Sequence, residues 1–405
     1  MSMINPAPFS VKNVTKIVCF ILSERCWIKR IVLLFLGWRL LLFLPLVFSE
    51  IVLSPRENYG YTLLTHFLEK GSVLSNFLLY PFGNFDAAYY LLIAAKGYTV
   101  NAGFFPLFPL SIHFATLPFN VLPFDPIQYF IVITLVSTYL LISLIVFYRL
   151  IRLDHKENVA IWSIIFLLIF PTSFFYAAVY SESLFLLLSL LTFYFAREKK
   201  WTASGIAGAL LSATRIVGIA MWPALLYEYF KENKNKITIK ILPLFLMPLG
   251  LIGYAFYNLQ KWGNPFYFIQ AQGNFANNRT VDSIVLFPQT VFRYIKILFT
   301  LKPNIYEWWI AFFELSFFIF ALSLFYIAWK KKIRFSYLIF GFLCFLLPAS
   351  SGTFTGLPRY VLTIFPFFIT LALIKNKLFK IAYSAFSIIL LFIFFMLFSK
   401  GYFIS

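Results

Sequence analysis

The sequence predicts an all-α polytopic integral membrane protein with about nine to ten membrane crossings. Of its 405 residues, 61% are hydrophobic and only 12% are charged, whereas about a quarter of the residues in a soluble domain carry charge. Apolar runs of roughly 18 to 22 residues recur along the chain, and a helix of that length crosses a bilayer. The runs are continuous rather than alternating, which excludes a transmembrane barrel of strands.

The positive charge of the chain lies beside these apolar runs. The formal net charge is +19, which in a soluble protein would point to nucleic acid. Here most Lys and Arg gather where apolar runs end, a pattern typical of cytoplasmic loops. We therefore expect contact with anionic lipid and no binding of nucleic acid. The six basic clusters lie at residues 12–30, 149–156, 197–200, 231–240, 330–334 and 375–380.

The chain divides into a basic N-terminal segment, residues 1–30, which we expect in the cytoplasm, and a single transmembrane domain, residues 31–405. The first predicted span is Ile31–Ser49. A long polar loop follows at about residues 50–103 and is expected on the outer side of the membrane. Short helices are predicted within this loop at Tyr61–Leu68 and Ala87–Ala95.

Three later segments do not read as simple spans. Prolines interrupt residues 104–123, which favours a re-entrant or interfacial course. Residues 202–230 are too short for two spans, so two short helices meeting at a polar turn around Arg215 are expected, with small residues allowing close packing. Residues 283–301 are apolar but contain basic residues, which favours an interfacial helix. The other predicted spans are Ile127–Leu150, Val159–Phe175, Ser183–Ala196, Ile241–Leu259, Trp308–Trp329, Tyr337–Pro348, Tyr360–Ile374 and Ala382–Phe398.

A few carboxylates lie in apolar or aromatic surroundings, where an ionised group is costly and often functional. Asp125 directly precedes the span that starts at Pro126-Ile127 and is predicted to cap that helix. Asp86 and Glu182 lie at tyrosine-bearing turns on the predicted outer side, where capping of the following helix and catalysis both fit. The residues of this group are Asp86, Asp125, Glu182, Glu307 and Glu314.

Cations outside the basic clusters give a second signal. A guanidinium group presents a planar fork that binds two phosphate oxygens at once. Carboxylates and arginines at the outer membrane face therefore suit a lipid-linked phosphate substrate, although arginines that reach toward lipid head groups would also fit. These cations are Arg39, Arg215, Lys261, Arg279 and Arg359.

Five motifs resemble those of the PIG-V-type mannosyltransferases. Residues 86–110 resemble the family pattern in which an Asp follows a Trp and a later run reads F-F-P-L-Y-P-L, with Phe85 in place of the Trp. Four further stretches resemble S-x-x-Y-T-E-S-L-F, T-R-P-x-G, G-D-P-x-x-F-x-x-A-Q and M-P-R-Y-V-L, except that Ile216 replaces the Pro and Asn264 the Asp. In the family order these are residues 175–185, 214–218, 263–272 and 357–362.

The resemblance implies the GT-C glycosyltransferase fold with an active site on the extracytoplasmic face. Such enzymes transfer a hexose, here most simply mannose, from a polyprenyl-phosphate donor to a lipid or glycan acceptor. Asp86 is then expected to be the general base of an inverting reaction without metal or cofactor. The membrane would be the plasma membrane in a prokaryote and the endoplasmic reticulum in a eukaryote. The expected substrate-binding residues are Glu182, Tyr180, Arg215, Arg359, Gln272, Gln270, Lys261 and Tyr90.

A transporter or a lipid flippase is the competing interpretation. Many spans, broken helices and charges at membrane depth are also typical of carriers. An internal repeat around a site at the bilayer midplane would favour that class. The sequence contains no visible pair of matching broken helices in two halves, so the glycosyltransferase is the leading hypothesis.

Overall fold

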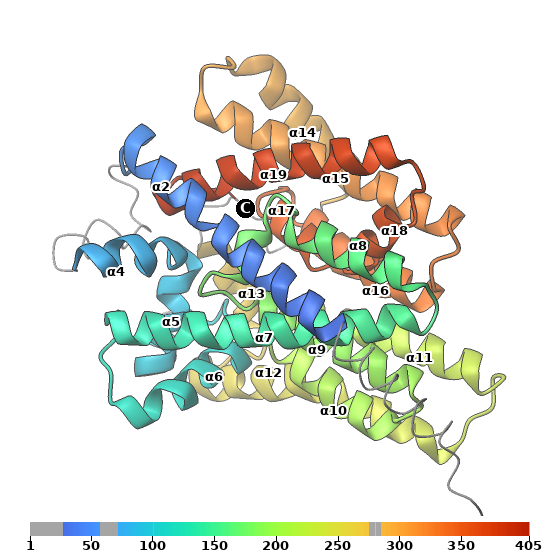
Figure 1. The fold of residues 1–405 in the computed structure, drawn as a ribbon. Coiled ribbons are helices and arrows are strands. Elements are labelled where there is room, and N and C mark those ends of the chain that lie inside the picture. The colour runs from blue at the N-terminus through green and yellow to red at the C-terminus, as the bar shows by residue number, and fades with distance from the viewer. Residues whose placement is uncertain (1–26, 57–71, 100, 275–279, 281–284, 405) are drawn as a thin grey trace, which may run out of the picture.

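The described part of the chain is built from helices that pack side by side, as the sequence predicts (Figure 1). A computed structural model describes residues 27–56, 72–99, 101–274, 280 and 285–404. Within these residues the only β pairing is an isolated bridge between Val285 and Ser351. Most of the expected cytoplasmic segment, the expected helix Tyr61–Leu68 and Arg279 lie outside the described residues.

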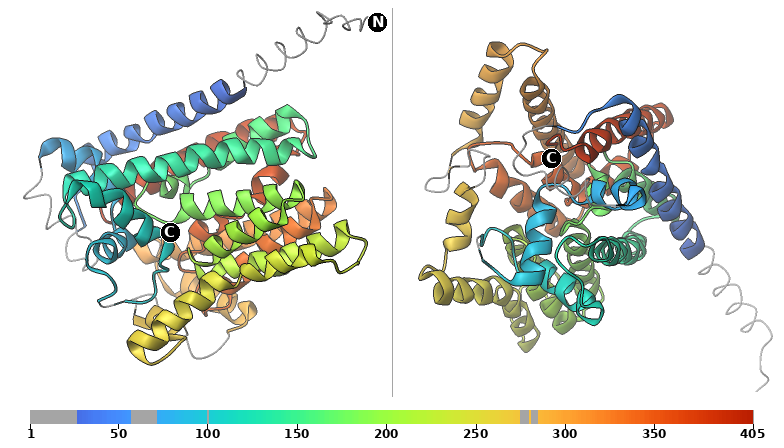
Figure 2. Two further views of the ribbon diagram at one scale, coloured as in Figure 1. Left: turned by 90° about the horizontal axis from the view of Figure 1, so that it is seen from below. Right: turned by 90° about the vertical axis from the view of Figure 1, so that its left-hand side faces the viewer.

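Among the residues that the structure describes, five helical segments are long and apolar enough to cross a membrane. In the left view of Figure 2 the blue first helix, the teal α7 and the yellow segment that ends in α12 run in roughly one direction. Each of the five segments contains a span predicted from the sequence, and together they make the chain an all-helical membrane protein. The segments are Trp27–Val52, which includes α2 (Phe43–Val52), α7 (Pro126–Arg152), Ile239–Trp262, which joins η5 (Ile239–Leu246) to α12 (Leu249–Trp262), α15 (Tyr306–Lys330) and α19 (Lys377–Ser399).

Shorter helices fill the space between the long ones and place their ends near one another. Several are the broken segments that the prolines and short apolar runs predicted. The number of crossings that they complete stays a prediction. In the first half they are α4 (Val73–Leu78), η1 (Tyr80–Phe82), α5 (Asp86–Lys96), α6 (Leu107–Thr116), η2 (Leu117–Phe119), α8 (Glu157–Leu168), η3 (Ser173–Tyr176) and α9 (Glu182–Arg197).

The second half continues this arrangement. The segment expected to form one span near residue 360 is two short helices, because Pro366 starts a new helix at its N-terminal end. The amphipathic helix expected near residues 283–301 is α14, which stands at the edge of the bundle (Figures 1 and 2). The short helices of this half are α10 (Trp201–Ser212), η4 (Ile216–Ala220), α11 (Met221–Glu232), α13 (Tyr267–Gln270), η6 (Ala271–Asn274), α14 (Phe287–Thr300), α16 (Phe335–Ala349), α17 (Leu357–Leu362) and α18 (Pro366–Ala372).

Close packing around α10 depends on its small residues, as the sequence predicts. At Gly205 an added Cβ would overlap the carbonyl group of Pro243, and at Gly208 it would overlap the side chain of Met247. Both partners belong to the segment that leads into α12. The two helical segments therefore approach at backbone distance, which is the use that membrane proteins make of small residues.

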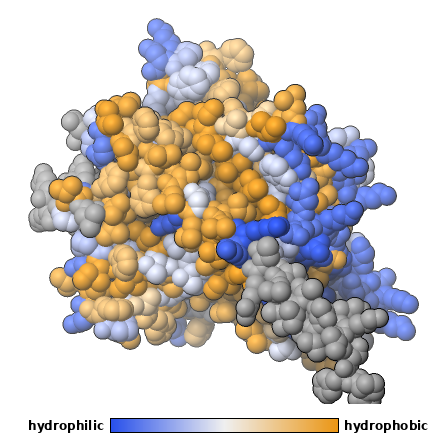
Figure 3. Space-filling view, in the orientation of Figure 1, coloured by the Kyte–Doolittle hydropathy of each residue, from blue (hydrophilic) through white to orange (hydrophobic). Residues whose placement is uncertain are grey.

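Ion pairs at one end of the bundle involve residues from three of the basic stretches. Arg197, at the last turn of α9, binds both carboxylate oxygens of Asp154 at 2.6 and 2.7 Å. Arg334 binds both oxygens of Glu228, and Ser336 donates a third hydrogen bond to the same carboxylate. We call these five residues the basic-end cluster. Figure 3 shows hydrophilic side chains gathered at the side of the molecule where α11 and α16 lie.

Candidate active site

Asp86 is the first residue of α5 and follows a strained turn. Phe85 has a φ of 57°, an uncommon conformation for a bulky residue. The turn is held from two sides, because the Asn84 amide donates to the carbonyl oxygen of Phe398 at 2.6 Å and the Tyr180 hydroxyl donates to that of Asn84 at 2.8 Å. These contacts with α19 and with the start of α9 fix the direction in which Asp86 leaves the helix end.

Glu182 is the first residue of α9, at the tip of the hairpin between α8 and α9. Hydroxyl groups tie this tip to α17. Thr172 donates to the carbonyl oxygen of Pro358 at 3.1 Å, and Tyr176 donates to that of Leu362 at 2.9 Å. The tip is fully buried, so the carboxylate of Glu182 lies inside the protein and is 1% exposed.

Two arginines reach the same place from other helix ends. Arg215 stands in extended conformation between α10 and η4, at the polar turn that the sequence predicts. Arg359 lies in the first turn of α17, which begins after Gly356. Gly356 has a φ of 84°, a conformation that a side chain would strain, so the sharp entry into α17 depends on glycine at this position.

The four side chains form a line of alternating charge, which we call the charge chain. Arg359 Nη1 lies 2.6 Å from Asp86 Oδ2, and its Nε lies 3.3 Å from Glu182 Oε1. Arg215 Nη1 lies 2.6 Å from the same Glu182 oxygen. Along this line the side-chain exposure is 26% for Asp86, 14% for Arg359, 1% for Glu182 and 10% for Arg215. Asp86 is therefore the most exposed of the four charged groups.

Aromatic rings cover the faces of both guanidinium groups. The Arg359 guanidinium carbon lies 5.3 Å from the ring centre of Tyr180 and 5.5 Å from that of Phe175. Tyr360 lies between the arginines, at 4.8 Å from Arg215 and 6.0 Å from Arg359. Cations over ring faces are attracted electrostatically. Only the edges of the guanidinium planes, where the N–H groups point, remain for the carboxylates or for a bound anion.

The Arg359 guanidinium stays protonated and positively charged. Burial alone would lower its pKa, but the neighbouring carboxylates of Asp86 and Glu182 outweigh that effect, so the pKa of Arg359 lies well above its ordinary value. The group is therefore a permanent cation at the end of a helix that is not among the five long ones. One acceptor of the charge chain is unsatisfied, because the buried Oε2 of Glu182 has no hydrogen-bond partner.

The capping interpretations of the two carboxylates are wrong. Each is the first residue of its helix rather than the residue before it, and neither cap position has a side-chain hydrogen bond. Both carboxylates bind arginines instead. Of the other three acids of this group, Asp125 caps its helix as the sequence predicts, because it accepts from the backbone N–H of Ile127. Glu314 accepts from the Tyr294 hydroxyl at 2.5 Å, and Glu307 lies 3.5 Å from Arg56.

The other candidate residues divide between the charge chain and a neighbouring cluster. Tyr90 is buried beside the chain, with its hydroxyl 3.2 Å from that of Ser181. Lys261 instead donates to the carbonyl oxygen of Tyr98 and lies over the ring of Trp262 at 5.4 Å.

The glutamines lie near that second cluster, and Arg39 lies elsewhere. Gln272 donates to the carbonyl oxygen of Gly103 at 2.9 Å, and Gln270 is exposed at the end of α13. Arg39 lies over the ring of Phe82 at 5.3 Å, within the first long helix. Among the described contacts, none joins Lys261, Gln270, Gln272 or Arg39 to the charge chain.

Sequence reasoning missed Tyr360 and Asn84. Tyr360 separates the two arginines, and Asn84 anchors the turn before Asp86. Both lie next to a predicted charged residue or within two positions of one. An aromatic residue directly after a buried arginine and an amide just before a candidate acid are the signals that could have found them.

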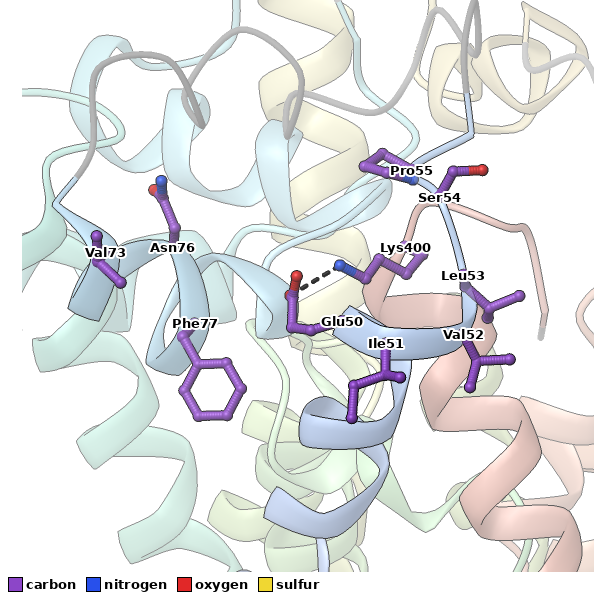
Figure 4. A pocket seen from close by; sticks show the side chains of 10 residues that line it. All are labelled: Glu50, Ile51, Val52, Leu53, Ser54, Pro55, Val73, Asn76, Phe77 and Lys400. Carbon is purple, nitrogen blue, oxygen red and sulfur yellow. Dashed lines mark ion pairs between the residues drawn. The ribbon is translucent and has the colours of Figure 1, made fainter.

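A cavity of about 650 Å³ lies apart from the charge chain, at the end of the first long helix (Figure 4). Apolar side chains form most of its wall, and an ion pair between Glu50 and Lys400 with an N–O distance of 2.7 Å closes one side. None of its lining residues belongs to the charge chain. The lining residues are Glu50, Ile51, Val52, Leu53, Ser54, Pro55, Val73, Asn76, Phe77 and Lys400.

Comparison with known proteins gives a distant structural similarity. No family model matches the sequence, and no curated protein matches it. Two crystal structures of the oligosaccharyltransferase of Archaeoglobus fulgidus are similar, one tethered to an acceptor peptide containing the NVT sequon and one in complex with Zn and sulfate. Their sequence identities are 13% and 14%, and the TM-score is 0.41 for both. The alignments cover 90% and 89% of this chain but only 55% and 53% of those chains, so this chain spans about half their length.

Proposed function

We propose that this protein is a membrane glycosyltransferase of the GT-C superfamily that takes its sugar from a polyprenyl-phosphate donor. The observation that carries the proposal is the charge chain, in which Asp86 is the most exposed member and two arginines lie deeper in the protein. This set offers a carboxylate to accept a proton and guanidinium groups to hold a phosphate, which are the two requirements of the reaction.

In the proposed reaction Asp86 accepts the proton of the acceptor hydroxyl as that oxygen attacks the anomeric carbon of the donor sugar. The bond between the anomeric carbon and the phosphate oxygen breaks, and its electron pair stays on the lipid phosphate. Arg359 and Arg215 stabilise the negative charge that develops there. Tyr180 lies against the Arg359 guanidinium and Tyr90 contacts the Tyr180 ring, and Glu182 holds the two arginines beside one another.

The position of the charge chain within the molecule supports an extracytoplasmic site. Glu182 starts α9, whose other end carries Arg197, and Arg215 follows the far end of α10, which begins directly after α9. Asp86 joins them through Arg359. Helix α9 has 16 residues from Glu182 to Arg197, which corresponds to about 24 Å at 1.5 Å per residue. If the basic end faces the cytoplasm, the charge chain lies near the opposite face, where polyprenyl-linked sugars are used in this superfamily.

The finer assignments rest on the motifs of the sequence. Mannose is the first donor to test because the five motifs resemble those of PIG-V-type mannosyltransferases. The acceptor is proposed to be a lipid or a glycan, because the site lies in a helical bundle at a bilayer. No metal or cofactor is required for the steps proposed above.

Purified protein in nanodiscs tests the proposal directly. The assay supplies polyprenyl-phosphate-linked mannose, and then other sugars, with total membrane lipid as acceptor, and it detects glycosylated product by mass spectrometry. We expect transfer by the natural sequence and a loss of at least about 10²-fold in Asp86→Asn, the lower end of what a general base contributes. Asp154→Asn, in the basic-end cluster, is the matched control and should transfer normally.

Failure of every donor, or full transfer by Asp86→Asn, would overturn the proposal. Movement of an intact sugar lipid across the bilayer without a new glycosidic bond would instead favour the flippase.

A further inference from the structure

The Arg359 guanidinium is only partly used by the protein. Its Nη1 donates to Asp86 Oδ2 at 2.6 Å. Its Nε lies 3.3 Å from Glu182 Oε1 but makes no hydrogen bond there. Within the described part of the chain, no acceptor engages Nη2. Arg359 therefore holds the partly exposed carboxylate of Asp86 with one strong hydrogen bond and keeps further N–H donors beside it.

The contact with Asp86 conflicts with the role proposed for that carboxylate. While Nη1 donates to Oδ2, the guanidinium offsets the negative charge of the carboxylate and takes one of its acceptor sites, so Asp86 is a weaker acceptor for the proton of a hydroxyl. The same N–H group is also the one best placed for an incoming phosphate, because it lies at the more exposed end of the chain. One donor thus has two possible partners, a carboxylate and a phosphate.

We propose that Asp86 and the lipid phosphate compete for the same edge of Arg359, so that arrival of the donor releases Asp86 to act as base. This inference rests on the proposed function, because it describes how that site would be switched on. In the resting protein Arg359 neutralises Asp86. With the donor bound, Arg359 pairs with the phosphate and Asp86 Oδ2 becomes available to the acceptor hydroxyl.

The surroundings of Arg359 allow this exchange without exposing a bare charge. Tyr180 and Phe175 cover the guanidinium face, so the group can turn in its own plane while its aromatic contacts persist. Glu182 stays within ion-pair distance, and its buried Oε2 has no hydrogen-bond partner. An unpaired acceptor of this kind beside a movable donor can take over part of the bonding when Asp86 is released.

The sequence of bonds follows from this arrangement. The phosphate oxygen replaces Asp86 Oδ2 on Arg359. Asp86 then accepts the hydroxyl proton while the acceptor oxygen bonds to the anomeric carbon, and the departing phosphate keeps the electron pair of the broken bond. Premature deprotonation of water or acceptor is disfavoured, because the base is free only when a donor is present.

Binding of polyprenyl monophosphate tests the exchange without needing any transfer. Protein in nanodiscs of phosphatidylcholine, which has no net charge, is titrated with the lipid, and binding is followed by native mass spectrometry. If Asp86 competes for Arg359, Asp86→Asn should bind the lipid phosphate about tenfold more tightly, a gain of about 1.4 kcal/mol.

Glu182→Gln is the matched control, because it removes one negative charge from the same site but leaves the bond between Arg359 and Asp86. Simple removal of repulsion would tighten binding equally in both variants. The exchange predicts tighter binding in Asp86→Asn only, and weaker binding in Glu182→Gln because Arg215 and Arg359 lose their common partner. Asp86→Ser repeats the test if Asp86→Asn does not fold.

Unchanged or weaker binding in Asp86→Asn, or equal tightening in both variants, would overturn the exchange. The result is separate from the glycosyltransferase assay. If the natural protein transfers sugar but Asp86→Asn binds polyprenyl monophosphate no more tightly, the proposed function stands and the exchange is wrong. Tightening without transfer from any donor would leave a phosphate-responsive site and remove the glycosyltransferase.

Discussion

The two ends of the bundle use the same kinds of residue in different ways. In the basic-end cluster, Glu228 is completely buried and accepts hydrogen bonds from Arg334 and Ser336 on both of its oxygens. In the charge chain, Glu182 is as deeply buried, but both arginines share one of its oxygens and the other has no partner. Both oxygens of the Glu228 carboxylate accept hydrogen bonds, whereas one oxygen of the Glu182 carboxylate accepts none.

This difference separates stability from chemistry. A buried ion pair holds a structure together only if its remaining donors and acceptors are satisfied, because desolvation of charge is costly. The basic end meets that condition. The charge chain does not, and its least buried member is the residue proposed to react. Unsatisfied groups at a buried site are a reason to expect a ligand.

The largest effect is expected for Arg359→Lys. Lysine keeps the charge but loses the planar fork that contacts Asp86 and Glu182 together. We expect kcat/KM for the donor to fall by at least about 10²-fold, equivalent to roughly 2.7 kcal/mol. Steady-state kinetics with varied donor concentration measure it. Arg334→Lys at the basic end is the control and should keep its kcat/KM, so equal losses in both would erase the distinction between the two ends.

Glu228→Gln should have the largest effect on stability. It leaves Arg334 half-buried without its bidentate partner, and breaking a buried pair from one side costs about 3 kcal/mol. Thermal unfolding in detergent measures the loss, and transfer per folded molecule should stay unchanged. Glu182→Gln should show the reverse pattern, with a small change in unfolding temperature and a large loss of transfer. A stability loss in Glu182→Gln as large as in Glu228→Gln would make the charge chain a second clamp.

The basic end should also weaken in acid. Burial by itself raises the pKa of Asp154, but the hydrogen bond and charge of Arg197 outweigh it, so its pKa lies below the ordinary value of 3.8. A carboxyl with a lowered pKa in the folded state contributes stability above its unfolded pKa and loses it as pH falls through the folded pKa. Stability should therefore fall below about pH 4. In Asp154→Asn this part of the pH dependence should be missing, and an identical pH profile in both proteins would contradict the assignment.

The smallest effect is expected at the exposed pair of Arg30 and Glu157. Its side chains are 57% and 46% exposed, and exposed pairs contribute about 0 to 1 kcal/mol. Arg30→Ala should change the unfolding temperature by little and the transfer rate not at all. A loss comparable with that of Glu228→Gln would show that burial does not decide which pairs matter at this end.

Much of the fold follows from the sequence alone. Continuous apolar runs can satisfy backbone hydrogen bonds within a bilayer only as helices, and the predicted spans at residues 127–150 and 382–398 lie within α7 and α19. A helix start and a site of close helix packing could also be predicted from the sequence. Asp125 before Pro126 caps α7, and the small residues of α10 pack against their neighbour.

What the sequence by itself determined is the list of helices and the scarcity of charges among them. The type of each residue fixes its transfer cost, so a rare acid in an apolar run is visible without coordinates. Only the tertiary structure decided which charges meet. Arg359 and Asp86 are 273 positions apart, and Arg215 and Glu182 are 33 apart. Their pairing depends on how helix ends are brought together by packing, and no local propensity encodes that. The tertiary structure also decided that Asp86 binds Arg359 rather than caps its own helix, because Arg359 comes from a distant part of the sequence.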